Sequence, residues 1–347
     1  MEDLNQPKHS PKLEDVAHYA GVSPASVSRV LNRVEPTSAR LREAVENAAR
    51  ELGYIPKRAT SRTTAKSIAV LSPDLLNPYF NETAVGIEDR ARDYGFVPFL
   101  ANITRAGLDP AGVVDWLRTI DPKGCIVFGG VLSDEALIAF SLRTPFPVVA
   151  INQAVNHPGL KSITIDYAKA TYTLSQHLFQ LGHRDIVFLG GSQSAATSRG
   201  KIQGIENAAR ETGLDLGGDW IFPGAPTIEW GFQAMTALLS PVRARRPTAV
   251  VCSCDLVALG ALHAVRSAGL SVPRDVSVVG FDDIDMACHA NPPLTTISPP
   301  KYEMGAQAVE LLVASRSDGD PIKNYVMLES PLIVRESTAV CGPKNRM

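Results

Sequence analysis

The stretch LEDVAHYAGVSPASVSRVLN, residues 13–32, predicts two short amphipathic helices separated by a tight turn. In its first half, apolar residues follow the i, i+3, i+4, i+7 spacing that places side chains on one face of a helix: Leu13, Val16, Ala17 and Ala20. Gly21 then permits a sharp reversal of the chain. This pattern is typical of a helix-turn-helix.

The second helix of the stretch begins at a strong start signal. Ser23 is a favourable N-cap and Pro24 suits the first helical position, where its missing N–H is no loss. The apolar face of this helix carries Val27, Val30 and Leu31. Its opposite face lacks carboxylates and can approach phosphate, with Ser28 flanking the residues Ala25, Ser26, Arg29, Asn32 and Arg33.

A third helix is predicted from about Ser38 to Gly53, which stops it. Three helices in about fifty residues give a small independent core. The two-helix pattern by itself is equally compatible with an ordinary helical hairpin.

From Ile68 onward, short apolar runs alternate with helical patterns, which predicts parallel sheets covered by helices. The expected strands are 68–72, 96–101, 125–129, 147–151, 185–190, 248–252 and 276–281. The expected helices are 79–94, 109–120, 133–142, 168–181, 199–212, 229–240 and 255–268. Three of these helices should end at a glycine: Gly182, Gly213 and Gly269. The two series predict two Rossmann-like lobes with a ligand cleft at their junction.

Composition narrows the class of protein. Residues 1–67 hold eleven Lys and Arg against eight Asp and Glu, whereas the whole chain has a formal charge of -2. This fits a modestly basic nucleic-acid module on a mildly acidic body. The N-terminal residues resemble no signal peptide and no apolar run reaches membrane-spanning length, so we expect a cytoplasmic protein. The C-x-C pair Cys252 and Cys254 lacks further ligands at metal-binding spacing, which favours buried thiols.

Three blocks of the N-terminal region, DVAHYAGVS, SVSRVLN and RELGYIP, closely resemble the headpiece of the lactose-repressor/galactose-repressor (LacI/GalR) family of bacterial transcription regulators. The later blocks SPDLLNPYF, QLGHRDIVFLGG, DLVALGAL, VPRDVSVVGFDD and NPPLTTI extend the resemblance to about Ser337. It implies a body of the type I periplasmic-binding-protein fold, a homodimer, and a second helix that enters the major groove of operator DNA. The crossover segments between the lobes are expected near 160–165, 291–298 and 324–328.

The resemblance implies roles for residues of the headpiece. The residues expected to contact bases are Pro24, Ala25, Ser26 and Arg29, and Arg29 can pair with guanine. Contacts to backbone phosphate fall to Ser23, Ser28, Asn32, Ser38 and Tyr54.

The same resemblance places effector contacts on loops of the body. After the first strand, Asn77, Tyr79 and Phe80 begin a helix that faces the cleft, where a ring can stack on a sugar or base. Phe80 is equally compatible with simple packing of the lobe. Asn152 follows the fourth strand and can both donate and accept.

Two charged residues complete the expected effector site. Arg199, five residues before Gly204, corresponds to an arginine that binds hydroxyls or carboxylates in the family. The alternative is a surface arginine paired with a carboxylate. Asp282 can accept from two adjacent hydroxyls, and Asp283 is the weaker candidate. Pro226 and Cys254 depart from the family pattern, so the effector's identity stays open, with a sugar favoured.

The segment between headpiece and body is basic and carries no acidic residue. Lys57, Arg58 and Arg62 would follow phosphate there. Relatives fold this segment as a hinge helix with a leucine wedge, whereas this chain has Thr63 at the wedge position and several poor helix formers. A disordered tether and a hinge helix therefore both remain open.

We thus expect an all-α headpiece at 1–56, a linker at 57–67 and an α/β body at 68–340. The first lobe is expected at about 68–161 and 299–323, and the second at 162–298 and 324–340. The expected function is a dimeric operator-binding repressor controlled by a small molecule, without cofactor or metal. The alternative is a sensor or solute-binding protein whose DNA binding is weak or vestigial. An enzyme is disfavoured because the histidines are scattered and no HExxH, GxSxG or phosphate loop is present.

Overall fold

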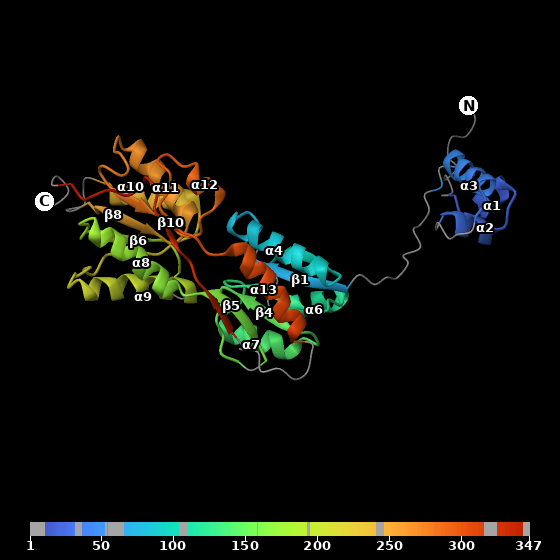
Figure 1. Cartoon of the computed structure of the whole chain (residues 1–347), viewed down its shortest axis with the longest axis horizontal. Coiled ribbons are helices and arrows are strands. Elements are labelled where there is room, and N and C mark those ends of the chain that lie inside the picture. Colours follow the sequence, from blue (N-terminus) through green and yellow to red (C-terminus); the bar gives the residue numbers. More distant parts are fainter. Residues whose placement is uncertain are drawn as a thin grey trace, which may run out of the picture. The chain divides into compact units, whose positions relative to one another are not determined.

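The computed structural model describes residues 11–31, 37–52, 54, 66–103, 110–157, 159–192, 195–240, 246–315 and 325–342 (Figure 1). The contacts within the chain divide it into two units, 1–65 and 66–347. None of the described helices is long and apolar enough to cross a membrane. The expected linker residues Lys57, Arg58 and Arg62 lie outside the described residues, as does Asn32.

The first unit, here called the headpiece, contains three helices: α1 (Leu13–Ala20), α2 (Pro24–Leu31) and α3 (Ala39–Glu51). Gly21 adopts a left-handed conformation with φ of 65° between α1 and α2. The three helices share one small core that contains Val16, Ala17, Val27, Val30, Val45 and Ala48. The helix-turn-helix expected from the sequence is therefore confirmed as a local structure.

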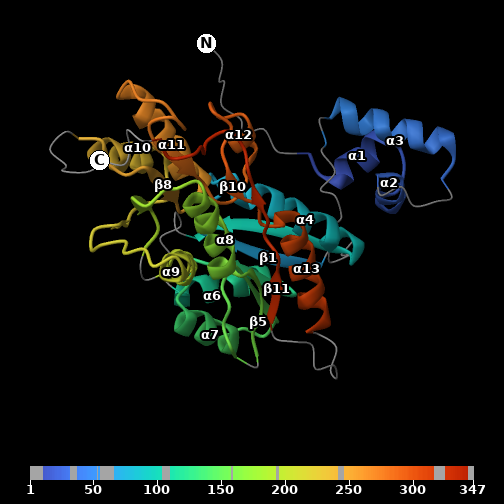
Figure 2. The same ribbon diagram turned by 60° about the vertical axis from the view of Figure 1, so that its left-hand side comes forward.

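The second unit, the body, begins with a six-stranded parallel sheet. Its strands are, in spatial order, β11 (Tyr325–Leu328), β5 (Lys161–Ile165), β4 (Val148–Ile151), β3 (Cys125–Phe128), β1 (Lys66–Ser72) and β2 (Phe96–Asn102). Helices α4 (Tyr79–Asp93) and α13 (Lys301–Ala314) cover one face, and α6 (Pro110–Ile120) and α7 (Asp134–Arg143) cover the other (Figures 1 and 2). We call this the first lobe.

The second lobe is built on a four-stranded parallel sheet in the order β7 (Ile221–Phe222), β6 (Ile186–Leu189), β8 (Ala249–Cys252) and β9 (Ser277–Val279). Helices α8 (Tyr167–Gln180) and α9 (Ala196–Glu211) cover one face, and α10 (Ile228–Leu238) and α11 (Asp255–Ser267) cover the other (Figure 1). The short helix α12 (Asp285–Cys288) follows β9, and β10 (Thr296–Ile297) pairs antiparallel with β12 (Leu332–Ile333).

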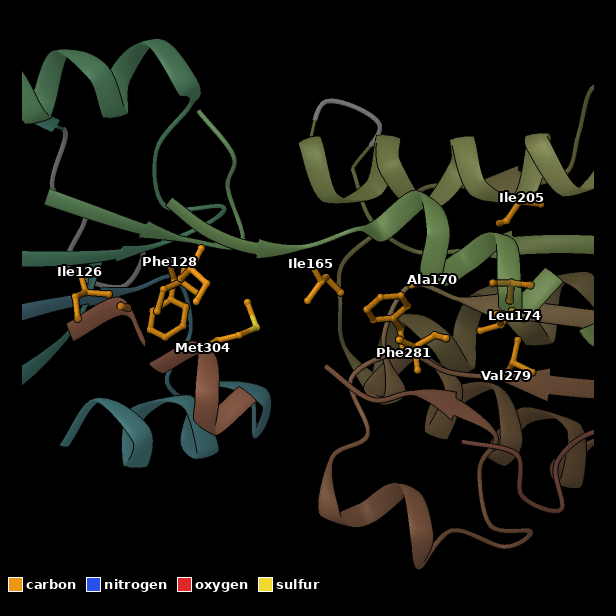
Figure 3. Close-up of a cluster of buried hydrophobic side chains, with 14 of the residues drawn as sticks. Ile126, Phe128, Ile165, Ala170, Leu174, Ile205, Val279, Phe281 and Met304 are labelled. Carbon is orange, nitrogen blue, oxygen red and sulfur yellow. The ribbon is translucent and has the colours of Figure 1, made fainter. Parts of the chain in front are cut away.

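Burial on both faces explains why the strands read as continuous apolar runs. In β1, Ile68 and Val70 join the core under α4 and α13, while Ala69 and Leu71 join the core on the opposite face. The first of these cores continues from one lobe into the other. Figure 3 shows Ile165 between the side chains of the first lobe and those of the second.

Close backbone approach between paired helices is made possible by glycines. A Cβ on Gly86 of α4 would lie 2.1 Å from the carbonyl oxygen of Tyr302, and one on Gly305 of α13 would lie 2.1 Å from that of Thr83. These two helices therefore pack backbone against backbone. Gly231 and Gly260 create the same approach between α10 and α11.

The structure agrees with the seven predicted strands and seven predicted helices to within about three residues at each end, and corrects the lobe limits. Gly182, Gly213 and Gly269 follow their helices with positive φ, as expected. Residues 161–165 and 325–328, expected as crossovers or second-lobe residues, are instead strands β5 and β11 of the first sheet, because they pair with each other and with β4. Lys66 and Ser67, expected in the linker, already belong to β1.

Candidate functional site

The exposed face of α2 is the candidate DNA-reading surface of the headpiece. Pro24, Ala25 and Arg29 are exposed, and Ser26 is half-buried. The Ser23 hydroxyl accepts from the backbone N–H of Ser26 at 3.2 Å and lies 2.9 Å from the Ser26 hydroxyl. Ser23 therefore caps α2 and holds its first turn in place.

The other expected phosphate contacts are distributed around the headpiece. Ser38 caps α3, because its hydroxyl accepts from the backbone N–H of Leu41 at 3.3 Å. Tyr54 is half-buried and packs against the headpiece core. Ser28 is half-buried on α2. The cap uses Ser38 as an acceptor only, so its hydroxyl can still donate to a phosphate oxygen.

In the body, a cavity of about 480 Å³ is lined by residues of both lobes. Most of the loops that form it follow the carboxyl ends of parallel strands, where α/β folds place their ligands. The first lobe contributes Asn77, Tyr79, Phe80, Gly129 and Asn152. The second lobe contributes Tyr167, Ser198, Lys201, Pro226, Ser253, Cys254 and Asp282, among others. We call this cavity the inner chamber.

The first-lobe wall of the inner chamber is aromatic and amide-bearing. Asn77 starts α4 by accepting from the backbone N–H of Tyr79 at 3.0 Å. The Asn152 amide donates to the Tyr79 hydroxyl at 2.7 Å, which leaves its Oδ1 buried and without a hydrogen-bond partner among the described residues. Burial raises the pKa of Tyr79, so this phenol stays neutral. Phe80 packs edge-on against Phe128 with ring centroids 4.9 Å apart and also lines the chamber, so packing of the lobe does not remove it from the candidate site.

On the second-lobe wall of the inner chamber, the buried ammonium of Lys201 lies over the ring of Phe281. Lys201 Nζ donates to the Ser253 carbonyl at 2.6 Å and lies 3.6 Å from the centroid of Phe281. Burial lowers the pKa of Lys201, and the nearby Asp282 carboxylate partly offsets this. Tyr167 stacks on Phe281 with centroids 5.7 Å apart. The cation is therefore held by a carbonyl and by the ring faces.

Asp282 projects from a tight left-handed turn after β9. Its φ is 115° and that of Asp283 is 50°. The Lys301 ammonium holds this turn by donating to both carbonyl oxygens, at 2.8 and 3.1 Å. Arg335 bonds the Asp283 carboxylate at 2.7 Å, so Asp283 is engaged in structure and Asp282 is the one that lines the cavity. Burial raises the pKa of Asp282 to about 7, although Lys201 and Lys301 lower it in part.

The structure brings five of the six expected effector residues to the inner chamber, namely Asn77, Tyr79, Phe80, Asn152 and Asp282. Arg199 is exposed on α9 and lines an adjoining cavity instead. The reason is the phase of the helix. Helix α9 starts at Ala196 and buries Ser198, Lys201 and Ile205 along one face. Arg199, two residues from Lys201, points about 200° away from it.

Lys201, Tyr167 and Ser253 line the inner chamber but were not among the residues expected from the sequence. A signal for Lys201 was present, because the apolar stripe of α9 at Ile205 and Ala208 continues backwards onto it. Tyr167 and Ser253 gave no such signal. Cys252 and Cys254 are buried free thiols, as expected. Burial raises the pKa of Cys254 to about 12, so it lines the chamber as a neutral thiol.

Comparison with known proteins identifies both units. Residues 12–57 match the family model for bacterial regulatory proteins of the lacI family, and residues 175–338 match a periplasmic binding protein-like domain. The HTH-type transcriptional repressor CytR of Escherichia coli K12 is 33% identical over 329 residues, which cover 94% of this chain and 96% of CytR.

Solved structures of regulators that align over nearly the whole chain are similar as well. A complex of the transcriptional regulator CelR with cellobiose is 30% identical with a TM-score of 0.69, covering 94% of this chain and 99% of CelR. The lac repressor dimer bound to operator and the anti-inducer ONPF is 30% identical with a TM-score of 0.71, covering 95% and 100% of the two chains. The chain therefore belongs to the lacI family of bacterial regulatory proteins and is a DNA-binding transcriptional regulator with an effector-binding body.

Proposed function

We propose that this protein is a cytoplasmic, homodimeric repressor whose operator affinity is set by a neutral, hydroxyl-rich effector, with a sugar favoured, bound in the inner chamber. The observation that carries the proposal is the composition of that chamber. One lobe supplies Asn152 Oδ1, an acceptor without a partner in the described part of the chain, and the other supplies the Asp282 carboxylate and the Lys201 ammonium. Because both lobes touch the same cavity, a ligand there stabilises one closure of the lobes over others.

The chemistry of the chamber favours a sugar ring. Carboxylate and amide oxygens accept from hydroxyls, and an aromatic wall of Tyr79, Phe80 and Tyr167 can stack on the apolar face of a ring. Two similar proteins support this class, since CelR was solved with cellobiose and a regulator from Enterococcus faecium with ribose.

At the DNA, we propose that α2 reads bases with Pro24, Ala25, Ser26 and Arg29, while Ser23, Ser28, Ser38 and Tyr54 contact phosphate. The exposure of Pro24, Ala25 and Arg29 on one helix supports this assignment. Asn32, Lys57, Arg58 and Arg62 remain proposed phosphate contacts from the sequence alone.

The test begins with selection of a preferred duplex from a random DNA pool by the full-length protein. Sugars, nucleosides and phosphorylated sugars are then screened by thermal shift, and each hit is titrated against the protein–operator complex by fluorescence anisotropy. We expect a hit to change operator affinity at least tenfold. Asp282→Asn should abolish the thermal shift, whereas Asp285→Asn, at an exposed carboxylate three residues away, should retain it. Failure to enrich any duplex, or ligand binding without effect on DNA affinity, would contradict the proposal.

A further inference from the structure

A second cavity of about 260 Å³ adjoins the inner chamber and is also lined by both lobes. The two cavities share Gly129, Asn152, Ala195 and Thr197 in their walls. We call the second cavity the outer chamber. A ligand long enough to pass Asn152 can therefore occupy both.

Gln153 lines the outer chamber and has a buried acceptor with no partner among the described residues. Gln153 is 6% exposed, and its amide N–H groups donate to the Leu132 carbonyl at 3.0 Å and to Asp134 Oδ1 at 2.7 Å. These two bonds use both amide protons and fix the orientation of the group. Its Oε1 then has no hydrogen-bond partner within the described ranges. A buried acceptor is costly to leave unpaired, so a ligand donor that reaches it would be stabilising.

The two buried acceptors belong to residues that are adjacent in the sequence, Asn152 and Gln153. Asn152 Oδ1, at the junction, is oriented by the bond from its amide to Tyr79, just as Gln153 Oε1 is oriented by Asp134. Both lie at the end of β4, where Asn152 has a φ of 63°. Two oriented acceptors in series match a ligand with hydroxyl donors along its length.

The charged side chains that line the outer chamber weaken the binding of anionic ligands. Asp134 and Glu135 line it together with Arg199. Hydrogen bonds from the Glu135 backbone N–H and the Ser133 hydroxyl lower the pKa of Glu135, so this carboxylate is ionised at neutral pH. Two carboxylates against one guanidinium repel a phosphate group but accept from hydroxyls.

We propose that the effector is a neutral two-unit glycoside, a disaccharide rather than a monosaccharide or sugar phosphate, with one ring in the inner chamber and a second hydroxylated unit donating to Gln153 Oε1 in the outer chamber. This inference rests on the proposed function, because it takes the two chambers as one effector site. It adds the size and charge of the ligand.

The test fills the outer chamber with a large side chain and leaves the inner chamber open, so that the contribution of each chamber to binding can be measured. Ala196, exposed on the first turn of α9, lines the outer chamber but not the inner one. Ala196→Trp should fill the outer chamber while leaving the inner chamber open. Ala237→Trp, at an exposed alanine of α10 that lines neither chamber, is the matched control. Thermal melts of both variants verify folding.

The ligands are cellobiose, maltose, lactose and sucrose, their monosaccharides, and the corresponding 6-phosphates, measured by isothermal titration calorimetry on the full chain. We expect one disaccharide to bind at least tenfold more tightly than its component sugars and their phosphates. Ala196→Trp should remove that advantage, and Ala237→Trp should keep it.

Three outcomes would overturn the inference: a monosaccharide or a sugar phosphate that binds best, a disaccharide whose affinity is unchanged by Ala196→Trp, or no binding by any disaccharide. Failure of the proposed function can be distinguished from failure of this inference. A disaccharide that binds as described but leaves operator affinity unchanged contradicts the regulatory role alone, and a monosaccharide that alters operator affinity contradicts this inference alone.

Discussion

The ammonium of Lys301 lies 3.1 Å from Glu82 Oε2 and, at the same time, donates to the carbonyl oxygens of Asp282 and Asp283. Glu82 lies on α4 of the first lobe, about one turn after Tyr79, whereas Asp282 lines the second-lobe wall of the inner chamber. One almost fully buried lysine thus joins the two walls between which the effector is proposed to bind.

Replacement of this lysine should weaken both the fold and effector binding. In Lys301→Met the two carbonyls of the Asp282 turn lose a charged donor, and hydrogen bonds to charged groups contribute about 1.5–3 kcal/mol each. We expect urea denaturation to show a loss of about 2 kcal/mol or more, and calorimetry to show at least a tenfold weaker effector affinity. Lys169→Met removes a pair with Glu329 that is exposed on both sides and should change neither. Equal effects of the two substitutions would contradict this role.

The raised pKa of Asp282 predicts how stability depends on pH. The carboxyl has a pKa of about 7 in the folded body against about 4 in an unfolded chain, because burial disfavours its charge. The folded state therefore binds the proton more tightly. This contribution to stability is complete below about pH 4 and is lost as pH rises through about 7.

Urea denaturation of Asp282→Asn between pH 5 and 8 checks this sign. The variant should lose less stability than the wild type as pH rises, because asparagine does not titrate in this range. Asp285→Asn provides the control with an exposed carboxylate. Parallel curves for Asp282→Asn and the wild type would show that Asp282 is not the titrating group.

A single methyl group added between α4 and α13 should destabilise the first lobe. Gly86→Ala and Gly305→Ala each place a Cβ 2.1 Å from a backbone carbonyl of the opposite helix, so α4 and α13 must separate. Overpacking of a core typically costs about 1–3 kcal/mol. We expect a loss in this range or above from chemical denaturation. Gly218→Ala, where a Cβ meets no atom of the described residues within 4 Å, should be close to neutral. A neutral Gly86→Ala would mean that the helices are less closely packed.

At the DNA, Arg29→Ala should remove discrimination between operator and scrambled duplex while weak, salt-sensitive binding remains. A bidentate contact to a base is worth about 1–3 kcal/mol of discrimination, whereas phosphate contacts are indifferent to sequence. Gel shifts with both duplexes over a range of salt concentrations measure this ratio. Arg50→Ala, at an exposed arginine of α3 that bonds Asn47, is the control. An unchanged ratio in Arg29→Ala would defeat the assignment.

Local patterns allowed much of the architecture to be predicted. The alternation of β-branched runs with amphipathic helices predicted parallel sheets, because strands buried on both faces must be apolar throughout, as β1 is. Helix starts at Ser23 and Ser38 and stops at glycines were also readable, since capping acts over three or four residues. Loops after strands indicated where a ligand would bind, and five of the six expected residues line one chamber.

The sequence by itself therefore determined the element order, the helix-turn-helix and the edge of each sheet that carries the site, all of which depend on periodicity and short-range hydrogen bonds. Only the tertiary structure decided that β11 joins β5, that Lys201 rather than Arg199 lines the inner chamber with Asp282, and that Lys301 bridges Glu82 to the Asp282 turn. These relationships link residues that are distant in the sequence, up to 219 positions for Glu82 and Lys301, or depend on the phase of one helix against its sheet. Tertiary packing determines these contacts. A local sequence pattern does not show which distant residue a given side chain will contact.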